Sequence, residues 1–224
     1  MDNDRLSALF AEAGRDNGFE QITAEFATYK DFKIRWLRAY KWIEFQVSDY
    51  LSTAPEEVIA EMADTVFRKI RGEKGPYTQR VCDWLSSEEF VRTNQPTFLR
   101  RSRGLSEGTV GNVRDLEEAY QRLIDRGLVE RDPSLVILWK AGGQPSRVGA
   151  ASVLMRVVTM SSSLDRETVP DEVVDYCLYA EIANIMVGFG KHGQERRDAY
   201  ASILERYPGR DDIELRMRRL CLTI

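Results

Sequence analysis

The sequence contains a single histidine, His192, among its 224 residues. A zinc centre with three imidazole ligands therefore cannot be built within one chain, and a Ser-His-Asp relay would have to use this one residue. Any catalytic chemistry must consequently depend on carboxylates or on His192 alone.

Cysteine is also scarce. The three residues Cys82, Cys177 and Cys221 are far apart and odd in number. This pattern indicates free thiols in a reducing compartment rather than a disulfide framework. We expect each cysteine to pack as a small buried hydrophobe.

Long hydrophobic runs are missing from the sequence. No segment reaches the roughly 18 uncharged apolar residues that a membrane span needs. The first residues, MDNDR, lack the basic region and apolar run of a signal peptide. We predict a soluble cytoplasmic protein with no membrane partner.

Basic residues do not outnumber acidic ones. The chain has 32 lysines and arginines against 36 acidic residues, a net charge of −4, and a pI of about 5.3. This balance counts against a dedicated nucleic-acid-binding protein. Hydrophobic residues at 43% and charged residues at 30% are typical of a globular chain. No internal repeat is evident along the sequence.

The spacing of apolar residues predicts an α+β protein. Residues 32–48 alternate as a β-hairpin does, and residues 94–111 show no regular pattern. We expect an N-terminal extension over 1–110, either separate or part of the same domain, and a second region over 111–224. Helices are predicted over 1–18, 52–72, 78–91, 112–127, 169–187, 194–207 and 212–220, and strands over 135–139 and 153–160.

The most distinctive segment is VPDEVVDYCLYAEIANI, at 169–185. It resembles the active-site helix of the SprT-like and YgjP-like zincin metallopeptidases, which has the form P-x-x-V-x-D-Y-V-x-x-H-E-L-x-H. The resemblance covers 147–220 and implies a zincin-like domain, in which a small twisted sheet packs on this helix. The matching residues are Pro170, Val173 or Val174, Asp175, Tyr176, Glu181 and Ala183, followed by Tyr200, Leu204, Glu205, Tyr207 and Pro208 in the next helix.

The chain departs from the family pattern at the metal ligands. In the family, two histidines four residues apart bind zinc, and the glutamate between them is the general base. Here the ligand positions hold Ala180 and Asn184, and the third, counted back from Tyr200, falls on Arg196. Glu181 alone remains. The family resemblance implies zinc, but because its ligands are absent here we expect no cofactor. We hypothesise that Arg196 pairs with Glu181 in place of the metal; the alternative is a solvated Glu181.

The expected function is that of a pseudopeptidase, an inactive metallopeptidase-like protein that binds another protein or an extended peptide. The segment 153–160 resembles the edge strand beside which such enzymes hold their substrate. Because β-augmentation needs backbone groups and no metal, binding would survive the loss of zinc. The expected peptide contacts are Val153, Met155 and Val157.

Two other functions stay open. One is a hydrolase with a rebuilt site, with or without a metal, that would use Glu181, His192 and Asp198. The alternative interpretation of His192, which we favour, is an exposed loop residue with no role in a site. A module that binds nucleic acid or an acidic protein surface would show affinity falling steeply with salt. Its contacts would be the short basic cluster Arg100, Arg101 and Arg103.

Overall fold

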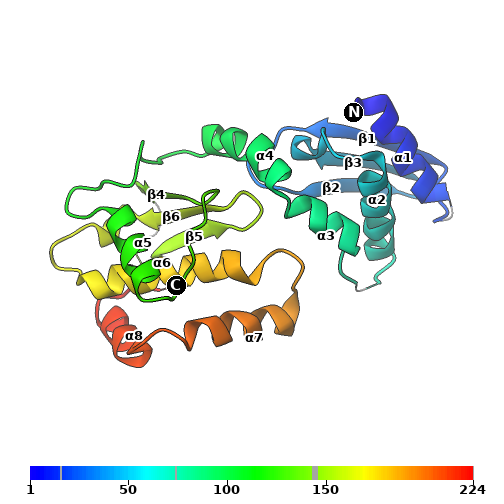
Figure 1. Cartoon of the computed structure of the whole chain (residues 1–224). Helices are drawn as coiled ribbons and strands as arrows, with labels where there is room; N and C mark the ends of the chain where they lie inside the picture. The colour runs from blue at the N-terminus through cyan, green and yellow to red at the C-terminus, as the bar shows by residue number, and fades with distance from the viewer. Residues whose placement is uncertain (16, 74, 143–145, 224) are drawn as a thin grey trace. The chain divides into compact units, whose positions relative to one another are not determined.

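The computed structural model describes residues 1–15, 17–73, 75–142 and 146–223 and shows an α+β protein (Figure 1). The chain divides into two compact units, unit 1 over Met1–Phe90 and unit 2 over Val91–Ile224. This boundary, between residues 90 and 91, differs from the one expected from the sequence, between residues 110 and 111. No helix among the described residues is long and apolar enough to cross a membrane.

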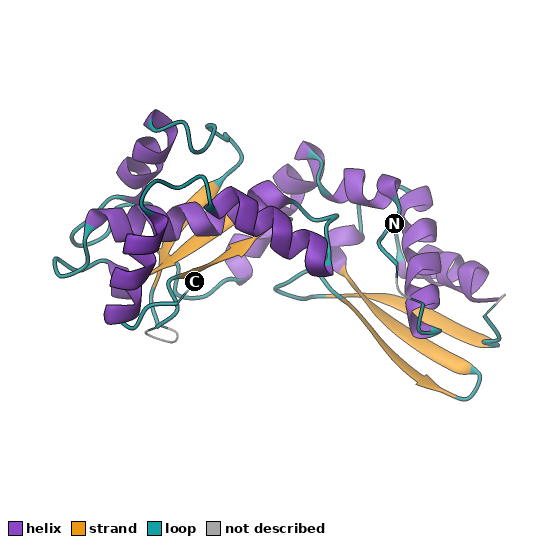
Figure 2. Ribbon diagram, turned by 90° about the horizontal axis from the view of Figure 1, so that it is seen from below, coloured by secondary structure: helices purple, strands orange, loops and turns teal. Residues whose placement is uncertain are grey.

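Unit 1 is built on a three-stranded sheet that carries helices on one face (Figure 2). The predicted first helix is confirmed and buries Leu6, Leu9 and Phe10. The predicted hairpin is also confirmed, with Tyr40 at a positive φ of 49° in its turn. The elements are α1 (Asn3–Arg15), β1 (Gln21–Ala27), β2 (Ile34–Ala39), β3 (Trp42–Ser48), the short 3-10 helix η1 (Asp49–Leu51) and α2 (Glu56–Ile70).

The next segment differs from the prediction of one helix over 78–91 and an irregular stretch after it. Two helices form instead, α3 (Gln79–Leu85) and α4 (Glu88–Arg101). The break lies at Ser86 and Ser87, where the Ser87 hydroxyl accepts a hydrogen bond from the backbone N–H of Phe90 at 3.2 Å. Helix α4 then continues through Pro96, which lacks a backbone donor but does not end the helix.

Unit 2 places one buried helix between a sheet and two further helices. Helix α6 packs against the sheet on one side and against α7 and α8 on the other (Figure 1). Most of its residues are buried on both of these sides, including the two acidic residues Asp175 and Glu181. The elements are α5 (Leu116–Asp125), β4 (Val136–Lys140), β5 (Gly149–Ser152), β6 (Val157–Ser161), the 3-10 helix η2 (Ser162–Leu164), α6 (Asp171–Val187), α7 (Gly193–Leu204) and α8 (Arg210–Arg219).

The prediction of an edge strand over 153–160 is wrong. Residues 153–156 form the turn between β5 and β6, and β6 is the central strand, paired with β4 on one side and β5 on the other. Val157 and Met155 are buried, so they cannot receive a peptide. The valine-rich run is typical of a central strand covered on both sides. The edge strands of this sheet are β4 and β5, and β5 is the one that the sequence analysis did not predict.

The two units repeat one succession of elements: helix, three strands, a 3-10 helix and a second helix. The strand order is also the same, since the first and third strands are parallel neighbours and the second pairs antiparallel with the third. Each 3-10 helix follows a serine (Ser48, Ser161) and ends at a fully buried leucine (Leu51, Leu164). The segments TAPEEV (53–58) and TVPDEV (168–173) then lead into α2 and α6.

Candidate functional site

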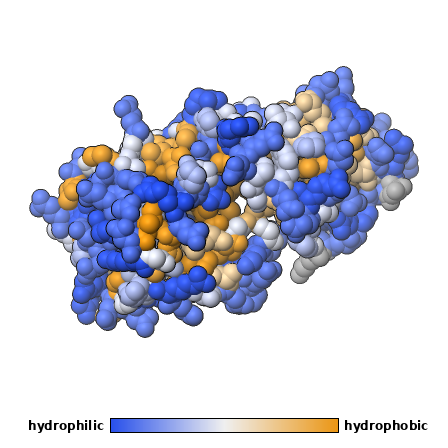
Figure 3. All heavy atoms as spheres, in the orientation of Figure 1, coloured by the Kyte–Doolittle hydropathy of each residue, from blue (hydrophilic) through white to orange (hydrophobic). Residues whose placement is uncertain are grey.

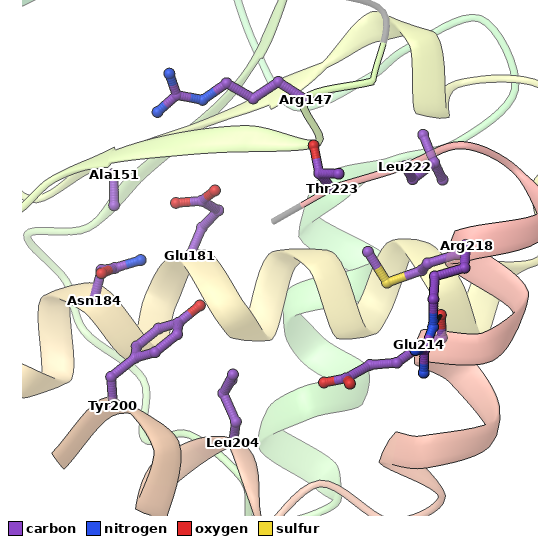
Figure 4. Close-up of a pocket in the computed structure, with 11 residues that line it drawn as sticks. Arg147, Ala151, Glu181, Asn184, Tyr200, Leu204, Glu214, Arg218, Leu222 and Thr223 are labelled. Carbon is purple, nitrogen blue, oxygen red and sulfur yellow. Dashed lines mark hydrogen bonds between the residues drawn. The ribbon is translucent and has the colours of Figure 1, made fainter. Parts of the chain in front are cut away.

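A pocket of about 830 Å³ opens between the edge strand β5 and helix α6, within unit 2. Figure 4 shows side chains from β5, α6, α7 and α8 pointing into it. Figure 3 shows hydrophobic side chains gathered on one face of unit 2 within a rim of hydrophilic ones. The residues that line it include Arg147, Ala151, Glu181, Asn184, Tyr200 and Leu204.

The buried carboxyl of Glu181 is the most unusual group in the pocket. It rises from α6 toward β5 (Figure 4), and the residue is 5% exposed. Among the described residues, no group donates a hydrogen bond to it. Burial raises the pKa of Glu181 to about 7 because the carboxylate loses hydration, and the nearby charge of Arg147 offsets only part of this effect. A group poised near neutral pH in a pocket is typical of a functional site.

The space above Glu181 exists because β5 carries small side chains. A Cβ added to Gly149 would lie 2.7 Å from the backbone oxygen of Thr159 and 3.1 Å from Cγ of Glu181. Ala151, two residues later on the same face, also lines the pocket. A larger side chain at either position would fill the room in which the carboxyl sits.

Tyr200 provides the second polar group of the pocket. Its ring extends from α7 and points its hydroxyl toward the same space as Glu181 (Figure 4). The hydroxyl is buried, and no described group lies within hydrogen-bonding distance of it. Burial, with the nearby Glu181 carboxylate second, raises the pKa of Tyr200 to about 12. The phenol is therefore neutral at physiological pH and can both donate and accept a hydrogen bond.

The residues at the family's metal-ligand positions do not fit a zinc ion. Ala180 is fully buried and has no donor atom. The amide nitrogen of Asn184 donates to the backbone oxygen of Ala180 at 3.3 Å, and its oxygen accepts from Nη2 of Arg196 at 3.2 Å. Within the described part of the chain, no group of three His, Cys, Asp or Glu side chains is arranged to hold a metal ion.

The hypothesis that Arg196 pairs with Glu181 is wrong. Nη1 of Arg196 donates to the backbone oxygen of Gly188 at 2.8 Å, at the C-terminal end of α6. A cation is favourable there because the free carbonyl groups carry partial negative charge. On α7 the side chain directed toward Glu181 is Tyr200, one turn further along the helix than Arg196. The alternative of a solvated Glu181 stays a prediction, since the residue is 5% exposed and its carboxyl faces the pocket.

The other candidate residues lie outside the pocket. His192 is exposed at the start of α7, where its ring centre is 6.3 Å from that of Phe189. Asp198 is exposed and accepts a hydrogen bond from Gln194 at 2.5 Å. Neither residue lines the pocket, so the structure does not bring them together with Glu181.

The basic cluster also stands apart from this site. It occupies the end of α4 and the residues after it, and none of its members lines the pocket. Nη2 of Arg100 donates to the Thr97 hydroxyl at 2.8 Å. The cluster residues Arg100 and Arg103 are exposed, and Arg101 is half-buried.

The cysteines follow the expectation of burial only in part. Cys177, in α6, is buried as predicted, Cys82 is half-buried and Cys221 is exposed. Burial raises the pKa of the Cys82 thiol, which disfavours the thiolate. No described cysteine lies among the pocket-lining residues.

Two further residues that match the family motif have structural roles. Asp175 is 1% exposed and receives hydrogen bonds from Nε and Nη2 of Arg122, at 3.0 and 2.8 Å for its closest contacts. The Tyr176 hydroxyl donates to Glu214 at 2.5 Å, which links α6 to α8. Both interactions fix α6 in unit 2, and neither Asp175 nor Tyr176 lines the pocket.

Sequence reasoning identified Glu181 but missed the residues that give it a setting. Nothing in the sequence indicated that Gly149 and Ala151 lie on a strand, because a strand of small residues lacks the alternation of apolar and polar side chains that identifies one. Tyr200 was noted as a match in the helix and not as a pocket residue. Comparisons with protein-family models, with curated proteins and with solved structures found no match to this chain.

Proposed function

We propose that this chain is a metallopeptidase-like binding protein without peptidase activity, and that unit 2 binds an extended segment of a partner protein. The supporting observation is the pocket itself, which lies between an edge strand and the buried helix that resembles the zincin active-site helix. Of the family's chemical groups, Glu181 is the one retained. The zincin-like identity of unit 2 belongs to this proposal.

The partner segment adds to the free edge of β5. Strand addition uses main-chain hydrogen bonds, and alternate side chains of the added strand face the pocket. The chain's own Thr223 already pairs in parallel beside Arg147, just before β5. The edge available to a partner is therefore β5, Gly149–Ser152. Within it the Gly149 carbonyl already accepts a hydrogen bond from Nε of Arg147 at 3.0 Å, so the exposed Arg147 side chain must move for a partner to pair there.

Two variants on one strand test this proposal. Ala151→Trp fills the pocket face of β5, whereas Ala150→Trp places the same ring on the opposite face. Peptides are selected from a displayed random library on the full chain in EDTA, and their affinities are measured by calorimetry. We expect Ala151→Trp to weaken binding by roughly tenfold or more and Ala150→Trp to change it by less than about threefold.

Either of two results would contradict the proposal. One is a library that yields no binder to the folded chain. The other is a set of binders that lose affinity equally with both variants, since they would not use the pocket. Unfolding curves of each variant confirm that the comparison is made between folded proteins.

One observation favours a second candidate, a hydrolase that uses Glu181 as a general acid or base. Such groups work best with a pKa close to the operating pH, and burial places that of Glu181 at about 7. Tyr200 would orient the reacting group. In this case Glu181→Gln abolishes turnover of a peptide or ester substrate, whereas the binding proposal predicts no turnover in the parent chain.

A further inference from the structure

The pocket presents two polar groups that no described residue satisfies. Glu181, buried in the floor, is acceptor-only when ionised, and the buried hydroxyl of Tyr200 can accept as well as donate. The neighbouring amide of Asn184 is not free, because Arg196 and the Ala180 carbonyl occupy it. A buried polar group left without a partner costs free energy, so this site favours a ligand that supplies donors.

The walls around these groups are apolar. Ala151, Leu204, Met217 and Leu222 contribute hydrocarbon surface to the same pocket. A ligand suited to both features has an alkyl stem that packs on these walls and several donors at its tip. The ammonium group has three donors and no acceptor.

We propose that the pocket binds a primary ammonium group on an alkyl stem, supplied by a lysine side chain of the partner segment. The ammonium group donates to the Glu181 carboxylate and to the Tyr200 oxygen, and the stem lies against Ala151 and Leu204. This inference rests on the proposed function, because the lysine arrives on a strand added to β5.

Other charged groups face the same pocket and modify the binding. From the segment before β5, Arg147 is exposed, with Nε held by the Gly149 carbonyl at 3.0 Å. From α8, Arg218 and Glu214 line the far side, and Glu214 is paired with Arg210 at 2.7 Å. The Cys177 thiol on α6 is neutral, because burial raises its pKa. Arg147 therefore opposes a cationic ligand, and its exposure to solvent screens this effect.

The test uses two small probes of nearly equal shape, N-acetyl-lysine methylamide and N-acetyl-norleucine methylamide. Binding to the full chain is followed by NMR chemical-shift titration at pH 8. We expect the lysine probe to bind about tenfold more tightly than the norleucine probe. Glu181→Gln should reduce this ratio to about one, and Tyr200→Phe should reduce it several-fold.

Three controls make the result specific. Glu205→Gln removes the same charge from an exposed position outside the pocket and should leave the ratio unchanged. Arg147→Gln should strengthen binding of the lysine probe, because it removes a like charge. Lowering the pH from 8 to 6 should reduce the ratio about tenfold, because protonation of Glu181, whose pKa is about 7, removes the acceptor charge.

Equal affinity for the two probes, absence of binding by both, or a ratio that survives Glu181→Gln would overturn the inference. A preference for N-acetyl-glutamate methylamide that grows as the pH falls would overturn it too, since it would show an anion site. Failure of the proposed function, strand addition to β5, can be distinguished from failure of the ammonium site. Library peptides that depend on Ala151 without a lysine leave strand addition intact, whereas a lysine probe that binds in the absence of any peptide binder leaves only the ammonium site.

Discussion

Units 1 and 2 differ at the position that makes the pocket, although they repeat the same elements. Aligning Pro55 with Pro170, at the start of α2 and α6, places Val66 of unit 1 where unit 2 has Glu181. Both residues are buried. Unit 1 therefore completes an apolar core at the position where unit 2 holds a carboxyl group.

The edge strands show the matching difference. Ile34 pairs with Val47 and Gly149 pairs with Met160, and Val47 and Met160 each precede the serine that starts the 3-10 helix. By the same register, Trp36 of unit 1 corresponds to Ala151 of unit 2. Unit 1 thus carries large side chains at the two strand positions where unit 2 has Gly149 and Ala151, although Trp36 is 44% exposed.

This comparison shows that the fold alone does not create the site. The aromatic cluster of unit 1, in which the ring centre of Phe45 is 4.7 Å from that of Phe10 and 5.2 Å from that of Phe67, fills its interior with apolar atoms. The pocket of unit 2 arises from side-chain size on one strand and from one carboxyl on one helix. Exchanging these residues between the units should therefore transfer the open pocket and the buried carboxyl group from one unit to the other.

The largest effect is expected from placing the carboxyl in the wrong unit. Val66→Glu buries an acid with no pocket around it and should lower the free energy of unfolding of unit 1 by about 4 kcal/mol at pH 8. Urea unfolding is followed by tryptophan fluorescence in a Trp139→Phe background, in which Trp36, Trp42 and Trp84 report on unit 1. The control Val66→Met retains an apolar side chain and should cost less than about 1.5 kcal/mol. A loss below 1 kcal/mol for the glutamate, on the order of an ordinary surface change, would break the comparison.

The next effect is the pH dependence contributed by Glu181. Its pKa is raised from 4.5 to about 7 in the folded state, so the folded chain binds the proton more tightly than the unfolded chain. Stability from this group is therefore present at low pH and is lost as the pH rises from about 4.5 to about 7, by about 3 kcal/mol in total.

Glu181→Gln should remove that dependence. The variant should be more stable than the parent by up to about 3 kcal/mol at pH 8 and nearly equal to it at pH 4.5. The measurement is urea unfolding across this pH range, with the exposed Glu205→Gln as the charge-matched control. A constant difference between variant and parent at every pH would show that Glu181 titrates normally.

A smaller effect concerns Asp175, whose counterpart in unit 1 is Ala60. Asp175→Asn weakens a buried interaction with Arg122 and should lower stability by about 2 kcal/mol. The matched control is Glu172→Gln on the same helix, because Glu172 pairs with Arg216 at the surface and should contribute less than about 1 kcal/mol. Thermal unfolding of both variants checks the ranking. Equal losses of stability would mean that the buried Asp175–Arg122 pair stabilises unit 2 no more than the surface pair does.

The smallest effect is expected at the start of α5. The Asp115 side chain accepts a hydrogen bond from the backbone N–H of Glu117 at 2.9 Å and caps the helix. Asp115→Ala should lower stability by about 1 kcal/mol, whereas Asp115→Asn keeps the acceptor and should cost a few tenths. If the two variants unfold at the same temperature, the cap does not stabilise unit 2.

The sequence predicted elements whose apolar spacing is regular. The first helix, the hairpin of β2 and β3, and α6 were recognised because burial of one face, or of all faces, leaves a clear pattern. Strand β5 was missed because Gly-Ala-Ala-Ser has no alternation of large and polar side chains. The valine-rich run after it was predicted to be the edge strand of the sheet. Because of Pro96, the segment from residue 94 was predicted to be irregular, whereas α4 continues through it.

The site was predictable only at the level of single residues. Glu181 stood out through the family resemblance, but its burial depends on contacts between segments distant in sequence. Arg196 and Tyr200 lie one turn apart on α7, and sequence spacing did not reveal which of them faces Glu181. The repeat went unnoticed because the similar sequence at the start of α2 and α6 is short, TAPEEV and TVPDEV, whereas backbone pairing reveals it directly.

The central claim is that the pocket under β5 binds an extended partner without a metal ion. It is tested most directly by measuring, in EDTA, the affinity of one selected peptide for the parent chain and for Ala151→Trp. We predict binding that EDTA does not change and that Ala151→Trp weakens by roughly tenfold or more. Binding that is abolished by EDTA and restored by stoichiometric zinc, or that is unaffected by Ala151→Trp, would contradict the account.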